Sequence, residues 1–186
     1  MKLDRILTAT AAFCTAAAMG AAANAENPMV GGAAMYANKN IIENAVNSAD
    51  HETLVAAVKA AGLVETLQGE GPFTVFAPTD EAFGKLKEGS VEALLKPENK
   101  DQLAQILTCH VVAADAMSPA IKGMVDDDGG MHIVPTVGGC KLEATYDGDT
   151  IMLKDERGRT INVTIADVDQ SNGVIHVVDN VILPAK

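Results

Sequence analysis

Four histidines, His51, His110, His132 and His176, are the side chains of this 186-residue chain best suited to ligate a metal ion. Histidine ligands on one element often lie a few residues apart, as in HxxxH, and these four have no such spacing. His110 continues the apolar helical face that contains Leu103, and His176 lies among valines. We expect both to be buried, hydrogen-bonded core histidines, and the sequence predicts no metal site.

An acidic stretch, Asp126–Gly130, could offer carboxylate oxygens to calcium. It lacks the alternating ligands and the terminal glutamate of an EF-hand loop. The stretch is therefore interpreted as a solvated loop.

Nucleophilic catalysis has little support in the sequence. There is no GxSxG motif, and the adjacent pair Cys109 and His110 is no evidence for a catalytic dyad. We expect Cys109–Val112 to form a strand, in which neighbouring side chains point to opposite faces. The sequence predicts no catalytic residue, no cofactor and no enzymatic activity.

The first 25 residues resemble a secretory signal peptide, with two basic residues, an Ala-rich apolar run and the small-residue cleavage pattern Ala23-Asn24-Ala25. A secreted or periplasmic protein is expected. Residues 26–39, which include Gly31-Gly32, are predicted to be a flexible lead-in to the domain.

The chain carries a formal net charge of −11 and has no basic stripe. Such a surface repels phosphate backbones, so nucleic acid is not expected to be a partner. No apolar run of about 20 residues follows the signal peptide, so no transmembrane segment is expected after cleavage.

Two cysteines, Cys109 and Cys140, would remain after cleavage, in an oxidising compartment. A bridge between them would stabilise the fold by roughly 3–4 kcal/mol on the chain-entropy model. Two separate buried thiols are an equally good interpretation, because free cysteine behaves as a small apolar residue.

Helical patterns come first and strand patterns later. Apolar residues recur at helical spacing between residues 40 and 67, Asp50 is a candidate cap for the second helix, and Pro97 suits the start of another. Beyond Met131 the period becomes two, with turns at Asp147-Gly148-Asp149 and Asn172-Gly173. Val174–Leu183 is apolar on both faces and is predicted to be a central strand. This order indicates an α+β fold.

Two longer stretches are more specific. Pro72–Phe83, PFTVFAPTDEAF, predicts a strand, a turn and a helix in which Thr79 is the N-cap and Asp80 and Glu81 lie in the first turn. It resembles the first signature of fasciclin (FAS1) domains, and Ser171–Pro184, SNGVIHVVDNVILP, resembles the second. The resemblance covers nearly all of residues 40–186, which we expect to be one domain.

The resemblance implies an antiparallel β-sandwich-like wedge with N-terminal helices packed against it. It also implies an extracytoplasmic adhesion or surface-interaction module, without catalysis or a required cofactor.

The resemblance further suggests candidate interaction residues. Asn99, Lys100, Asp101 and Leu103 match an integrin-recognition motif in animal relatives, with Gln102 in place of its Ile. His110 lies where the family has a Tyr-His pair, although Cys109 replaces the tyrosine. Asp167 and Val168 match the centre of a second such motif.

These observations predict an exported, non-catalytic module for cell-surface adhesion or envelope protein–protein interaction. Its partner would be a protein or a cell-surface or matrix component, and the module itself a monomer or weakly self-associating. One alternative is a small-ligand carrier or sensor with a pocket between helices and sheet, although few aromatic residues could line it. Another is a redox protein using Cys109 and Cys140.

Overall fold

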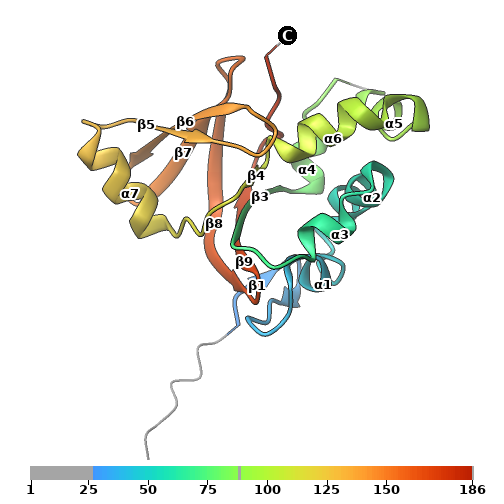
Figure 1. The fold of residues 1–186 in the computed structure, drawn as a ribbon, viewed down its shortest axis with the longest axis horizontal. Helices are drawn as coiled ribbons and strands as arrows, with labels where there is room; N and C mark the ends of the chain where they lie inside the picture. Colours follow the sequence, from blue (N-terminus) through green and yellow to red (C-terminus); the bar gives the residue numbers. More distant parts are fainter. Residues whose placement is uncertain (1–26, 88, 186) are drawn as a thin grey trace, which may run out of the picture.

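The computed structural model describes residues 27–87 and 89–185. Within them, helices lie on one side of a curled β-sheet, and one further helix packs at its other end (Figure 1). The helical elements are α1 (Ile41–Ala45), α2 (Glu52–Ala61), α3 (Val64–Leu67), α4 (Asp80–Gly84), α5 (Ser90–Leu94), the 3-10 turn η1 (Pro97–Asn99), α6 (Lys100–Thr108) and α7 (Ser118–Asp127). The strands are β1 (Met29–Val30), β2 (Ala33–Ala34), β3 (Phe73–Pro78), β4 (Val111–Val112), β5 (His132–Pro135), β6 (Lys141–Asp147), β7 (Thr150–Lys154), β8 (Thr160–Gln170) and β9 (Gly173–Val178).

The main sheet has the order β4-β3-β9-β8-β7-β6-β5. Its neighbouring strands are antiparallel except for β3 and β9, which run parallel and pair from Phe73↔Gly173 to Pro78↔Val178. The parallel pair is a departure from a purely antiparallel sheet. Because β3 lies in the first signature stretch and β9 in the second, the two stretches form neighbouring strands of the sheet.

The pair β3–β9 forms a wall between two hydrophobic cores. On β3, Val75 and Ala77 face the core beneath helices α1–α6, whereas Phe76 faces the core that α7 closes against β5–β8. This alternation follows from the two-residue period of a strand. The central position predicted for the last strand is confirmed, because β9 is buried on both faces between β3 and β8. The strand ends at Val178, however, and not at Leu183 as predicted.

Backbone packing at this wall requires glycine at one position. Gly173 begins β9 with φ of 151°, and a Cβ there would lie 1.9 Å from the carbonyl oxygen of Phe73. The Asn172-Gly173 turn predicted from the sequence therefore also allows the two strands to approach closely.

The predicted strand–turn–helix corner is confirmed, with one change of role. Thr79 caps α4 by accepting a hydrogen bond from the Ala82 amide at 3.2 Å. The Asp80 carboxylate accepts hydrogen bonds from the amides of Thr53 (2.8 Å) and Glu52 (3.3 Å), the first residues of α2. The predicted Asp50 cap of α2 is wrong, because a carboxylate distant in sequence satisfies those amides instead.

The flexibility of residues 26–39 stays a prediction, and residues 29–35 of this stretch contain secondary structure. There β1 and β2 form a short antiparallel hairpin, and Val30 and Met35 are buried in the helix-side core. Gly31, with φ of 57°, lets this hairpin lie against the end of α1, where a Cβ would meet the Ser48 hydroxyl at 2.2 Å. Two buried apolar side chains thus anchor a stretch whose small, polar composition suggested mobility.

Two further local predictions need correction. Asp126 and Asp127 belong to α7, which begins with Pro119 in its first turn, so the acidic stretch is only partly loop. Cys109 is the C-cap of α6, and the strand begins at Val111.

In the described part of the chain, we find no helix with the length and apolar character needed to cross a membrane. The predicted signal peptide lies outside the described residues.

Candidate interaction surface

The segment Asn99–Leu103 is only partly available at the surface. Lys100 and Asp101 are exposed at the start of α6, whereas Leu103 is buried in the helix-side core. The Asn99 side chain donates a hydrogen bond to the carbonyl of Ala93 at 2.7 Å, which ties α5 to the start of α6. The segment is therefore a helix start with two exposed charges, and Leu103 cannot contact a partner without unfolding.

His110 is buried and connects two elements. Its Nδ1–H donates to the carbonyl of Ile106 at 2.8 Å, and its Nε2 accepts from the amide of Ile182 at 2.9 Å. Burial lowers the pKa of His110 to about 4, because the charged ring would lose its hydration. The neutral ring joins α6 to the C-terminal segment, as expected for a core histidine, and is inaccessible to a partner.

Asp167 and Val168 also have structural positions. Val168 is fully buried, and Asp167 lies at an irregularity of β8 with φ of 58°. The Asp167 carboxylate accepts hydrogen bonds from the amide, at 2.6 Å, and the hydroxyl of Ser118 at the start of α7. Its own amide donates to His176 Nδ1 at 3.2 Å. The side chain therefore fastens β8 to α7.

The other two buried histidines differ in how well their ring nitrogens are hydrogen-bonded. His176 donates from Nε2 to the carbonyl of Ala116 at 2.8 Å, and burial lowers its pKa. His51 pairs through Nδ1 with the Ser48 hydroxyl at 2.8 Å, while its buried Nε2 has no hydrogen-bond partner among the described residues. Burial lowers the pKa of His51 as well.

Metal binding finds no support in the geometry. His132 contacts only Asp128, at 2.6 Å, among candidate ligands. Over residues 27–87 and 89–185, no three histidine, cysteine or acidic side chains come together as a ligand set.

The structure joins Cys109 and Cys140 in a disulfide whose Cα atoms are 5.4 Å apart. Both residues are buried, so the bridge holds the end of α6 against the turn that precedes β6. Beside it, the Val137 amide donates to the carbonyl of Val111 at 2.7 Å, which brings the two edges of the curled sheet together. A redox role would require accessible sulfur atoms, and this placement favours a structural bridge.

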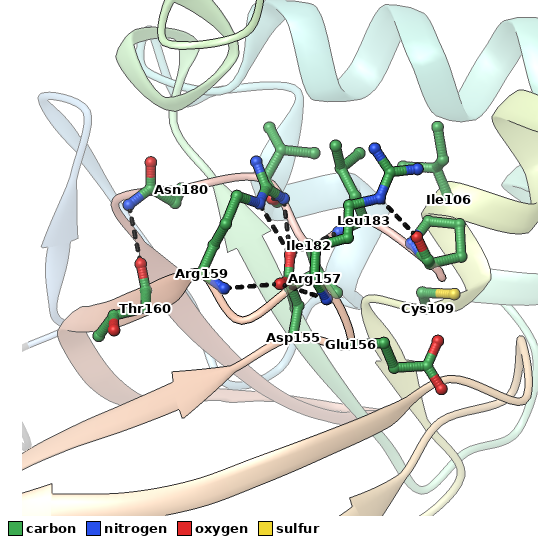
Figure 2. Close-up of polar contacts among 12 residues, drawn as sticks. Ile106, Cys109, Asp155, Glu156, Arg157, Arg159, Thr160, Asn180, Ile182 and Leu183 are labelled. Atoms are coloured by element: carbon green, nitrogen blue, oxygen red, sulfur yellow. Dashed lines mark hydrogen bonds and ion pairs between the residues drawn. The ribbon is translucent and has the colours of Figure 1, made fainter. Parts of the chain in front are cut away.

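A polar cluster surrounds the buried carboxylate of Asp155 (Figure 2). Arg159 donates to it from Nε (3.0 Å) and Nη2 (2.7 Å), and the amides of Arg157 and Leu183 donate at 3.0 and 3.2 Å. Burial of the carboxylate raises its pKa, but the hydrogen bonds from Arg159 and Leu183 outweigh this effect, so the pKa of Asp155 is lowered. The Asp155–Arg159 pair was not predicted from the sequence, although opposite charges four residues apart are a usable signal.

Several hollows open on the surface of the described residues, and they include two larger than about 300 Å³. One, of about 550 Å³, is mainly polar and has Glu70, Asp115 and Asp169 in its lining. The other, of about 350 Å³, lies between α5, α6 and the C-terminal segment, and we call it the α5–α6 groove. The groove is lined by Leu86, Lys87, Ser90, Ala93, Leu94, Asn99, Gln102, Ile106, Arg157 and Leu183.

The space between the helices and the sheet is much smaller. The cavity there, bordered by Leu54, Val75 and His110 among others, has a volume of about 30 Å³. Ligand pockets generally measure about 300–1,000 Å³. This packing counts against a carrier whose ligand lies between helices and sheet.

Comparison with known proteins accounts for the two signature stretches. The model of the fasciclin domain family matches residues 49–184. Protein sll1483 of Synechocystis is 45% identical over 161 residues, which cover 86% of this chain and 81% of that protein. The pig transforming growth factor-beta-induced protein ig-h3 is 37% identical over 131 residues, which cover 70% of this chain but only 17% of the longer protein.

The fold agrees with a solved structure of a FAS1 domain pair from the insect cell adhesion molecule fasciclin I. The TM-score is 0.70 at 18% sequence identity, over 78% of this chain and 51% of that one. The expected α+β FAS1 fold is confirmed. By its sequence and its fold, this chain belongs to the fasciclin family.

Proposed function

We propose that this protein is an exported, non-catalytic fasciclin module that binds another macromolecule at the cell surface or in the envelope. The observation that carries the proposal is the partial exposure of α5, none of whose residues is buried. Val91 and Leu94 on this helix are only partly covered, beside the α5–α6 groove. Apolar side chains left beside a groove are typical of a binding surface.

The relatives support this direction. The insect structure comes from a protein described as a cell adhesion molecule, and another relative, at 29% identity, is the immunogenic protein MPB70 of Mycobacterium bovis. The signal-peptide pattern of Met1–Ala25 agrees with export. A protein or matrix component is the proposed partner, because the acidic chain disfavours nucleic acid.

Sedimentation of purified protein with envelope fractions of its own host tests the proposal. We expect saturable binding that excess unlabelled protein displaces. A Val91→Asp/Leu94→Asp variant should bind much more weakly, whereas Ala166→Asp, on the exposed face of β8, should bind normally. Circular dichroism would show that both variants remain folded. Equal binding by both variants, or no saturable binding, would refute the proposal.

A further inference from the structure

We infer that the α5–α6 groove binds the C-terminal end of a partner polypeptide, with the last side chain in the groove and the terminal carboxylate on Arg157. This inference rests on the proposed function and adds the place and chemistry of binding. The apolar part of the groove is formed by Leu86, Leu94 and Leu183 and by the buried side chain of Ile106 in α6. It therefore suits an aliphatic or aromatic side chain.

Arg157 supplies the charge that an apolar groove would otherwise lack. Its Nε donates to the carbonyl of Pro184 at 2.7 Å, so the side chain is held across the C-terminal segment. Figure 2 shows the guanidinium beside the side chains of Leu183 and Ile106. A guanidinium fixed next to apolar side chains is well suited to a carboxylate, which it can bind through two parallel hydrogen bonds.

The Arg157 guanidinium keeps donors for a ligand. Among the described residues, no acceptor is hydrogen-bonded to its two terminal nitrogens, and no carboxylate forms an ion pair with Arg157 or Lys87. The nearby Glu156 carboxylate is occupied by the amides of Ala185 (2.9 Å) and Lys141 (3.4 Å). The groove thus combines positive charge with apolar walls, although the chain as a whole has a net charge of −11. The local positive charge favours an anionic ligand at this place.

Two amide side chains favour a peptide over a simple acyl chain. Asn99 and Gln102 both line the groove, and Gln102 is exposed with no hydrogen-bond partner in the described part of the chain. Peptide N–H and C=O groups would satisfy the side-chain amide of Gln102, whereas an alkyl chain would leave it unpaired at a cost in free energy. The volume of about 350 Å³ accommodates one or two residues of an extended tail.

The test is a titration of the ¹⁵N-labelled protein, in the form its host accumulates, with short peptides ending in leucine, valine or phenylalanine. Each peptide is used with a free C-terminal carboxylate and as the C-terminal amide. We expect at least one carboxylate peptide to shift the amide signals of α5, Gln102 and Leu183 and the Arg157 Nε–H signal. The matching amide should bind about tenfold or more weakly, since a charge-assisted hydrogen bond would be lost.

Arg157→Gln should weaken the carboxylate peptide by the same factor and leave the amide peptide unaffected, because both changes remove one interaction. Arg157→Lys should restore part of the affinity. Lys154→Gln, which removes a positive charge on β7 away from the groove, is the matched control and should bind normally.

Three results would overturn the inference: no shifts with any peptide, equal affinities for carboxylate and amide, or groove shifts with decanoate but with none of the peptides. The last result would identify a fatty-acid site instead. Saturable envelope binding that is lost in the Val91→Asp/Leu94→Asp variant, together with any of these, would leave the proposed function standing and remove only the peptide site.

Discussion

Strand β9 and helix α5 are both short and rich in apolar residues, yet their surroundings are opposite. Val174 to Val178 of β9 are all buried, between β3 and β8 and with a core on each face. None of Ser90–Leu94 in α5 is buried, because this helix lies at the margin of the helical layer. Strand β9 thus belongs to the wall that holds the fold together. Helix α5 belongs to the surface and keeps apolar side chains that are only partly covered.

The largest expected effect comes from removing His110, the histidine that joins α6 to the C-terminal segment. His110→Ala leaves the amide of Ile182 without its acceptor, removes one of the hydrogen bonds to the carbonyl of Ile106 and opens a cavity. We expect the free energy of unfolding to fall by about 3–5 kcal/mol. Urea denaturation measures it, with His132→Ala, a partly exposed histidine of β5, as the control. A loss below about 1 kcal/mol would contradict the role of His110 as a clamp.

Loss of the disulfide should have a similar or slightly smaller effect. The bridge spans a sequence separation of 31 residues, for which the chain-entropy model gives about 3.7 kcal/mol. A Cys109→Ser/Cys140→Ser variant should unfold at a correspondingly lower urea concentration, while binding to the envelope fraction is unchanged. Reduced binding by the still-folded variant would favour a functional role for the sulfur atoms.

Acid should destabilise the fold, because three buried histidines have lowered pKa values. The pKa of His110 is about 4 when folded and about 6.5 when unfolded, so between these values the unfolded chain binds the extra proton. The stability that the neutral ring contributes is complete above about pH 6.5 and is lost as the pH falls toward 4. The loss at pH 5 is about 2 kcal/mol. The lowered pKa values of His51 and His176 act in the same direction. Denaturation midpoints at pH 7.5 and 5 check this, and a His110→Gln variant should be less acid-sensitive. Equal midpoints for the parent protein would contradict it.

The cap between the first signature stretch and α2 gives the smallest change in stability. Asp80→Ala should cost about 1–2 kcal/mol, because two amides at the start of α2 lose their acceptor. Glu81→Ala, on the neighbouring exposed residue, is the matched control and should change little. Amide hydrogen exchange should rise at the start of α2 in the first variant only. Unchanged exchange there would contradict the capping role.

Local signals in the sequence predicted much of the secondary structure. Thr79 as a cap, the hairpin turn at Gly148 and the double-sided burial of β9 all depend on residues within one or two turns of each other. The role of Asp80 and the partner of His110 could not be predicted, since their hydrogen bonds join residues 27 and 72 positions apart. Such contacts depend on how elements pack, which periodicity does not specify.

The surface was harder to predict than the wall. Of the candidate interaction residues, Leu103, His110 and Val168 are buried, because short motifs do not reveal which side of an element faces the core. Lys100 and Asp101 remain predictions. The α5–α6 groove combines α5, α6, the 155–159 turn and the C-terminal segment, so no single stretch of sequence contains it.

The central claim is that this module binds a macromolecule at its α5–α6 groove. Photo-crosslinking in the native host tests this claim most directly. A photo-reactive residue would replace Gln102 at the groove or Ala166 on the exposed face of β8. We predict a discrete crosslinked species at position 102 that is absent at position 166 and lost when Val91→Asp/Leu94→Asp is added. Crosslinking at both positions alike, or at position 166 alone, would contradict the claim.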